Sequence, residues 1–267
     1  MYGTVIATAP LTPSMIRVVL GGDGLRSFNA VPYTDAYVNV AIPPANAPYS
    51  APFDIERVRA EMPRQFWPAR RRYTVRRWDT DERLLTLDIL IHRNAGLGGR
   101  WAADARAGDA LVLTGPAGAY RPEPDADWHL LVGDESAVPA IAASLEAIPQ
   151  NTTTVVRLLV NGPDHEVELP SRGRIDLDWL HRDDDECRDA TRLLEAVRSL
   201  ALPSGRGQAF VHGEANEVRE IRRHLLTRQL IERAHLSCSP YWRRHHTDED
   251  WRRVKADWNA RVERDVA

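Results

Sequence analysis

The pattern of apolar residues changes at a Pro-rich polar segment, residues 118–128 ("GAYRPEPDADW"). Before this segment, β-branched and apolar residues form short runs bounded by Gly, Pro, Asn or Asp, as is typical of strands. After it, continuous apolar runs alternate with segments whose apolar residues recur at helical spacing. Such a change predicts two domains, residues 1–122 and residues 123–267, joined by the polar segment.

The first domain is predicted to be a six-stranded antiparallel β-barrel, because short and frequent strands are typical of barrels. The predicted strands are two runs within 3–22, followed by 36–42, 71–78, 84–92 and 110–115. Residues 79–82 are the expected turn of a hairpin. The Pro- and Ala-rich insertion 43–63 is expected to form a surface loop.

The second domain is predicted to be a doubly wound parallel sheet, because strands and helices alternate in it. Buried strands are expected at 128–136, 152–160, 208–214 and 235–244, and helices at 137–149, 187–200, 215–234 and 247–265. Thr247 and Asp250 form an approximate capping pattern at the start of the last helix.

Composition excludes several classes of function. The 267 residues carry a net charge of −3, which argues against bulk electrostatic binding of nucleic acid. Cys187 and Cys238 show no pairing signature, and neither a signal peptide nor a membrane span is evident, so we expect a cytoplasmic protein without membrane insertion. No His-x-x-x-His or Cys-x-x-Cys spacing occurs, and the adjacent His245 and His246 would point apart, so no metal site is expected.

The segment 68–79 ("PARRRYTVRRWD") places five arginines around Tyr73 and Thr74. Alternation along a strand puts Arg71, Tyr73 and Val75 on one face and Thr74 on the other. One interpretation is an edge strand protected by charge. The other is a flavin site, in which arginine binds the pyrophosphate, tyrosine stacks on the ring and threonine hydrogen-bonds to it.

Two strands of the second domain are expected to end in polar residues at the same edge of the sheet. Nucleotides bind in open α/β sheets at the carboxyl ends of the strands, so this edge is a candidate nucleotide site. No Gly-x-Gly-x-x-Gly pattern occurs, and each motif is also compatible with an ordinary strand-to-helix turn. The candidate residues are Gly133, Asp134, Glu135 and Ser136 after one strand, and Gly213 and Glu214 at the end of the other.

Five motifs in order resemble the siderophore-interacting protein family, FAD-dependent ferric-siderophore reductases related to ferredoxin reductases. They are Arg71-x-Tyr73-Thr74-x-Arg76 with "DILIHRNAGLGGRWA", "LTGPAGAY", "VGDESAVPAIAASLEAIP", "FVHGEANEVREIRRHL" and "SPYWRRHHTDEDW". The resemblance implies a ferredoxin-NADP reductase-like fold, with non-covalent FAD on the barrel and NADPH or NADH on the second domain. It also implies reduction of a ferric siderophore to release Fe(II).

The resemblance assigns roles to residues of this chain. Thr74 and Tyr73 would lie at the flavin ring as the catalytic residues. The remaining FAD contacts would come from Arg71, Val75, His92, Asn94, Gly98, Gly99, Arg100 and Trp101, with Arg100 and Trp101 opening a helix whose N-terminus favours phosphate. The candidate arginines for an anionic siderophore are Arg64, Arg70, Arg243 and Arg244.

Three positions depart from the family pattern and leave the substrate open. Asn39 stands where lysine is usual, Ala117 where a larger basic residue is common, and His245 where glycine is usual. Two other functions remain open: reduction of a small redox protein or quinone, and a non-catalytic siderophore or heme carrier. The sequence predicts neither the oligomeric state nor the nucleotide preference, because Asn161 is not a clear acid and Arg172 and Arg174 cannot be placed.

Overall fold

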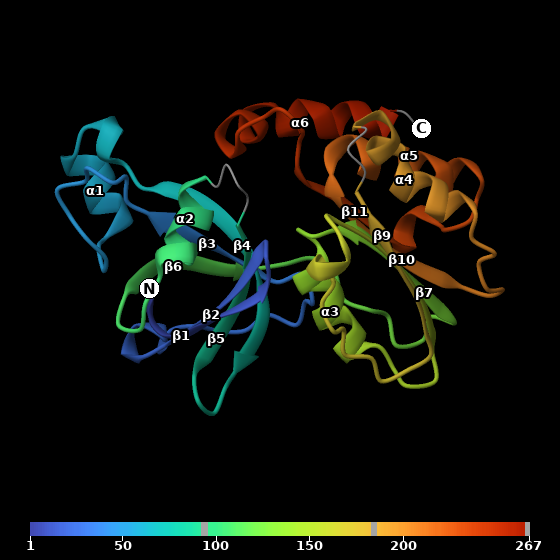
Figure 1. Cartoon of the computed structure of the whole chain (residues 1–267), viewed down its shortest axis with the longest axis horizontal. Coiled ribbons are helices and arrows are strands. Elements are labelled where there is room, and N and C mark those ends of the chain that lie inside the picture. The colour runs from blue at the N-terminus through green and yellow to red at the C-terminus, as the bar shows by residue number, and fades with distance from the viewer. Residues whose placement is uncertain (92–95, 183–185, 265–267) are drawn as a thin grey trace. The chain divides into compact units, whose positions relative to one another are not determined.

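The computed structural model describes residues 1–91, 96–182 and 186–264. Backbone contacts divide the chain into two compact units, Met1–Arg121 and Pro122–Ala267. The first is the barrel unit and the second is the sheet unit (Figure 1). Within the described ranges, no helix combines the length and the apolar composition needed to cross a membrane.

The barrel unit is a closed barrel of six antiparallel strands in the order β1-β2-β5-β4-β3-β6, as predicted (Figure 1). The barrel closes because alternate apolar side chains face inward. Val18 and Leu20, Val38 and Val40, and Leu85 and Leu87 are fully buried in one core. The strands are β1 (Tyr2–Thr12), β2 (Met15–Gly21), β3 (Tyr37–Ile42), β4 (Ala69–Asp79), β5 (Leu84–Leu90) and β6 (Ala110–Ala117).

The insertion between β3 and β4 is partly helical, which corrects the expectation of a plain loop. Helix α1 (Ile55–Glu61) begins at Asp54, whose side chain accepts a hydrogen bond from Arg57 N. The prediction missed this helix because it is only seven residues long and buries one side chain, Val58, so its periodicity is weak. A second helix of the barrel unit, α2 (Leu97–Asp104), connects β5 to β6.

The sheet unit is built on five parallel strands in the order β11-β10-β7-β8-β9. The strands are β7 (Trp128–Asp134), β8 (Thr153–Val160), β9 (Ile175–His181), β10 (Gly207–Glu214) and β11 (Leu236–Trp242). The order reverses between β7 and β10, so the carboxyl ends of these two strands form the switch point of the sheet. The sequence analysis missed β9, an edge strand that alternates exposed and half-buried residues instead of forming an apolar run.

Helices cover both faces of this sheet, which confirms the doubly wound architecture. Helices α4 (Glu186–Arg198) and α5 (Ala215–Thr227) share one core with Leu130 and Val132 of β7. On the other face, α3 (Val138–Ala147) packs closely over Gly133 (Figure 1). Short 3-10 helices occupy Asp23–Leu25, Arg64–Phe66, Pro163–His165 and Arg233–His235.

The last helix, α6 (Asp248–Arg264), follows β11 and carries the predicted cap. Asp250 N donates to Thr247 Oγ1 at 3.1 Å, and this hydroxyl donates to the Asp250 carboxylate at 2.6 Å. Trp251 and Trp258 bury the apolar side of α6 in a cluster with Ala215, the first residue of α5. This packing fixes α6 against the sheet unit.

The barrel contains a buried carboxylate whose removal should destabilise the protein. Arg17 donates to both oxygens of Asp88 at 2.7 and 2.8 Å, and Arg76 lies 4.0 Å away. We expect Asp88→Ala to cost about 2 kcal/mol and several degrees of unfolding temperature, because it leaves two partly buried guanidinium groups without their anion. Thermal unfolding followed by circular dichroism measures this loss.

The control is Glu61→Ala, which removes the exposed Arg57–Glu61 pair of α1. This variant should cost less than about 1 kcal/mol, because solvent screens exposed pairs. Equal losses in the two variants would contradict a structural role for Asp88.

Candidate functional site

Arg71 and Tyr73 lie on the face of β4 that meets the first turn of α2. Gly98 is buried there, and a β-carbon on it would collide with Tyr73 Oη and lie 3.1 Å from Arg71 Cγ. The Arg71 guanidinium also lies beside Gly96, the N-cap of α2. Because the first N–H groups of a helix lack helical acceptors, a cation and helix-terminal N–H donors come together here, as an anion site requires.

Helix α2 begins three residues earlier than predicted. Arg100 N donates to Gly96 O at 3.2 Å, so Gly98 and Gly99 belong to the first helical turn and not to a preceding bend. The predicted start of the helix was wrong because glycine is a poor helix former, and a Gly-Gly pair is more typical of a turn. His92 and Asn94 lie outside the described residues.

The strand that carries the arginine run is an interior strand of the barrel, so the edge-strand interpretation is wrong. β4 pairs with β3 on one side and with β5 on the other. Its charges therefore need another explanation than protection of a free edge. Two of them have local contacts: Arg76 lies 4.0 Å from the Asp88 carboxylate, and the Arg72 guanidinium lies 4.1 Å above the Tyr37 ring, a cation–π arrangement.

The other predicted FAD residues of the barrel unit fall into two groups. Thr74 is buried on the face of β4 opposite Arg71 and Tyr73, across from Tyr37 in the register. A register shift follows it, between Val75 and Arg77, where the backbone departs from regular pairing. Val75 and Trp101 pack against the barrel core, whereas Arg100 is exposed.

The carboxyl ends of β7, β10 and β11 meet around the Asp134 carboxylate. Asp134 accepts hydrogen bonds from Ser136 N at 2.8 Å and from Trp242 Nε1 at 2.7 Å. Gly213 lies directly against Asp134, since a β-carbon on it would be 2.8 Å from Asp134 Oδ2. Its φ of +151° favours glycine. The two predicted motifs therefore converge on one edge of the sheet.

Glu214 and Arg244 are held by contacts within this edge. Glu214 caps α5, accepting from Asn216 N and Glu217 N, and its other oxygen accepts from Arg244 N at 3.2 Å. The Arg244 side chain donates to Glu217 at 3.0 Å. Glu217 is 2% exposed; its burial, and next the charge of Asp134, raise its pKa to about 8.

A second ion pair joins the ends of β7 and β9. Arg182 donates to Glu135 Oε2 at 3.1 Å, and both side chains are largely buried. Burial raises the pKa of Glu135, and Arg182 opposes that shift. Arg182 and Glu217 were not predicted as site residues. Trp242 lies in the motif at the end of the last strand, which the sequence places beside this edge.

The other predicted substrate arginines differ in their surroundings. Arg64 and Arg70 are exposed in the barrel unit. In the sheet unit, Arg243 lies 5.9 Å from the centre of the Trp251 ring. His245, which follows Arg244, has a φ of +59° in the left-handed region, where glycine is favoured.

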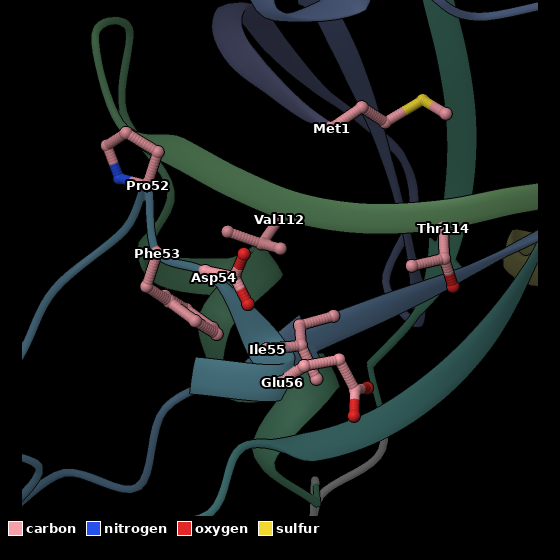
Figure 2. Close-up of a pocket in the computed structure, with 8 residues that line it drawn as sticks. All are labelled: Met1, Pro52, Phe53, Asp54, Ile55, Glu56, Val112 and Thr114. Atoms are coloured by element: carbon pink, nitrogen blue, oxygen red, sulfur yellow. The ribbon is translucent and has the colours of Figure 1, made fainter. Parts of the chain in front are cut away.

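The pocket of about 430 Å³ in the barrel unit is lined by none of the predicted site residues. Figure 2 shows its walls: Phe53, Ile55 and Glu56 around the start of α1, with Val112 and Thr114 on β6. Within the part of the chain that the structure describes, no group of three His, Cys, Asp or Glu side chains is placed to hold a metal ion.

Two family models together match most of the chain. Residues 4–120 match the siderophore-interacting FAD-binding domain, and residues 126–245 match the siderophore-interacting protein model. The chain belongs to the siderophore-interacting protein family. Each matched range falls within one of the two compact units.

Proteins that are similar to this chain include two that are named as ferric reductases. An uncharacterized protein of Mycobacterium tuberculosis is 37% identical over 95% of this chain and 93% of that protein. Ferric vibriobactin reductase ViuB of Vibrio cholerae is 35% identical over 68% of this chain and 67% of its own. The NADPH-dependent ferric-chelate reductase of Escherichia coli is 28% identical over 90% and 91%.

Solved structures show the same fold. A siderophore utilization protein from T. fusca aligns with a TM-score of 0.79 at 32% identity, over 93% of this chain and 94% of that one. A ferredoxin reductase of carbazole 1,9a-dioxygenase aligns with a TM-score of 0.64 at 16% identity, over 91% and 69%, and shows the fold alone. The architecture is therefore ferredoxin reductase-like.

The residues of the barrel unit fit the FAD that this family binds. Arg71 and the first turn of α2 offer a guanidinium and backbone N–H groups to a pyrophosphate. Gly98 keeps this turn against Tyr73, in a space that a β-carbon would fill. Tyr73 is half-buried and supplies an aromatic face on the same side of β4.

Adding one methyl group at Gly98 tests this arrangement. Gly98→Ala should lower FAD affinity at least about tenfold, because Tyr73 or the helical turn must move and a misplaced charge-assisted contact costs 1.5–3 kcal/mol. Tyr73→Phe removes the hydroxyl that the methyl group meets, so it should partly restore affinity in Gly98→Ala. Titration of apoprotein with FAD, followed by flavin fluorescence, measures these affinities.

Gly96→Ala is the matched control, because among the described residues its β-carbon would meet only Arg71 Nη2, at 3.9 Å. FAD affinity of this variant should stay near that of the wild type. A loss in Gly96→Ala as large as that in Gly98→Ala would contradict the steric account.

The raised pKa of Glu217 predicts how stability depends on pH. The folded-state pKa of about 8 lies above the ordinary value of 4.5, so the folded protein holds this proton more tightly than the unfolded chain does. The resulting stabilisation is fully present below about pH 4.5 and is lost as the pH rises through 8. The unfolding temperature should therefore fall by several degrees between pH 5.5 and 8.5.

Glu217→Gln should flatten this pH profile, because the amide does not titrate. Glu220→Gln, on the same helix and paired with Arg223 at the surface, should keep the wild-type slope. Thermal unfolding at constant ionic strength decides, and identical slopes in all three proteins would refute the assignment.

Proposed function

We propose that this protein is an FAD-dependent NAD(P)H reductase of ferric siderophores that releases Fe(II) in the cytoplasm. The placement of Arg71 and Tyr73 against the glycine-bearing first turn of α2 is the observation that carries this proposal. It gives one face of the barrel the groups that a flavin dinucleotide needs. The ferric reductases among the relatives support the same chemistry.

The proposed reaction explains how iron is released from a siderophore. The hard oxygen donors of siderophores hold Fe³⁺ tightly, whereas Fe²⁺ has a lower charge density and binds them weakly. The chemistry that FAD supplies when bound is the division of a two-electron hydride into single electrons. One nicotinamide hydride thus reduces two ferric ions and leaves oxidised nicotinamide and a proton.

The barrel residues bind and orient the flavin in this proposal. Arg71 and the N–H groups of α2 neutralise the pyrophosphate, and Tyr73 packs on the ring. Thr74 offers its hydroxyl, or the irregular backbone that follows it, to a ring heteroatom.

In the sheet unit, the carboxyl edge at Gly133–Ser136 and Gly213 receives the nicotinamide dinucleotide, because ligands of open α/β sheets bind at the switch point. Arg64, Arg70 and Arg243 attract an anionic ferric chelate. Glu214 and Arg244 have a structural role at this edge, because their polar groups are bound to each other and to Glu217.

The test is anaerobic stopped-flow of the FAD-loaded protein. NADH or NADPH should bleach the oxidised-flavin absorbance, and a ferric siderophore should restore it while a ferrous chelator traps Fe(II). Arg71→Ala combined with Thr74→Val should lower FAD affinity about tenfold to a hundredfold, because a charge-assisted contact and a hydroxyl are lost. Arg77→Ala, at an exposed arginine of the same strand, is the control and should bind FAD normally.

Each other function has its own outcome in this experiment. A folded protein that refuses FAD, or that no nicotinamide bleaches, is a carrier and not a reductase. Bleaching without reoxidation by any ferric chelate, but with reoxidation by a quinone or small redox protein, overturns the siderophore assignment.

A further inference from the structure

The end of β8 is the place where an open α/β sheet distinguishes NADH from NADPH. In a strand–helix–strand unit such as β7–α3–β8, the adenosine ribose lies beyond the second strand. An acid there accepts from the 2′-hydroxyl of NADH, and a free arginine there binds the 2′-phosphate of NADPH. The charges around Val160, the last residue of β8, therefore indicate which of the two nucleotides the protein prefers.

Two arginines that the sequence could not place are removed from this edge. Arg174 O accepts a hydrogen bond from Thr154 N at 2.9 Å, beside the start of β8. Gly173, next to Arg172, lies against the carbonyl groups of Gln150 and Thr152, which precede β8. Arg172 and Arg174 thus belong to the amino edge, opposite to the edge where a nucleotide binds.

The segment that follows β8 carries acids and no Lys or Arg over residues 161–168. Asp164 is exposed there, and Glu166 contacts His181 at 2.8 Å. His165 lies 3.8 Å from the Asp164 carboxylate. This segment would repel a dianionic phosphate more than it would attract one.

Arg182 is the arginine that the structure does place at the end of β8, and Glu135 holds it. Arg182 N donates to Val160 O at 2.8 Å, and its guanidinium donates to Glu135 Oε2 at 3.1 Å. The other oxygen of Glu135 is buried and, among the described residues, has no hydrogen-bond partner. A buried acceptor without a donor costs free energy, which a ribose hydroxyl at this edge would recover.

We propose that the Glu135–Arg182 pair sets the nucleotide preference and that the protein uses NADH in preference to NADPH. This inference rests on the proposed function, since it concerns the electron donor of the same reaction. Glu135 neutralises Arg182, the arginine that the described residues place at the end of β8, and it leaves a carboxylate oxygen for the 2′-hydroxyl. Glu135 and Arg182 are specificity residues, not catalytic ones.

The wild-type holoenzyme should be bleached by NADH with a second-order rate constant at least about tenfold above that for NADPH. Glu135→Gln removes a carboxylate that pairs with Arg182, so the rate constant for NADPH should rise about tenfold while that for NADH stays equal or falls. Calorimetric titration with NAD⁺ and NADP⁺ should show the same change in the ratio of dissociation constants, independently of turnover.

Glu166→Gln is the matched control. It removes one negative charge from the same edge, but Glu166 contacts His181 and not Arg182. Its nucleotide preference should change less than about twofold, because an exposed charge is screened. Arg182→Gln added to Glu135→Gln should abolish the gain for NADPH, and the flavin spectrum reports whether each variant is folded.

Three results would overturn the inference: equal wild-type rates with the two nucleotides, a preference for NADPH, or a Glu135→Gln effect no larger than that of Glu166→Gln. If neither nucleotide bleaches the flavin, the proposed function itself fails. That result is distinct, because the binding ratios measured by calorimetry still test the Glu135–Arg182 pair.

Discussion

The contact between Tyr73 and the backbone of Gly98 joins the arginine strand to the helix that follows β5. β4 is fixed by hydrogen bonds to strands on both sides, so the faces of its side chains are set by alternation alone. Arg71 and Tyr73 then meet the first turn of α2 only if position 98 carries no side chain. The proposed flavin site therefore depends on the absence of a side chain at Gly98 as much as on the charge of Arg71.

The sheet unit depends on a different constraint, the burial of acids at one edge. Asp134, Glu135, Glu214 and Glu217 are all buried, and their donors are backbone N–H groups, Ser136, Trp242, Arg182 and Arg244. Arg182 and Arg244 donate to the buried Glu135 and Glu217, so they oppose the effect of burial, which disfavours the charged form of both acids. The same groups shape this edge and set its charge.

Elements with strong local sequence patterns were predicted correctly, and elements with weak patterns were missed. The barrel strands were found because short apolar and β-branched runs lie between turn residues, and β7, β8 and β10 were found because they contain continuous apolar runs. The edge strand β9, the short helix α1 and the Gly-Gly start of α2 were missed, because tertiary contacts stabilise them against weak propensity. The partnership of Glu135 with Arg182 joins residues 47 apart in sequence, and no local pattern encodes it.

The loop after β11 illustrates how tertiary contacts fix a conformation that its residues disfavour. His245 adopts a φ of +59°, which costs a residue with a β-carbon roughly 1 kcal/mol. Arg244, before it, is bound through both backbone and side chain to Glu214 and Glu217. Thr247, two residues later, caps α6, whose tryptophans are buried. Because both flanks are fixed, the chain between them has one path, and His245 must follow it.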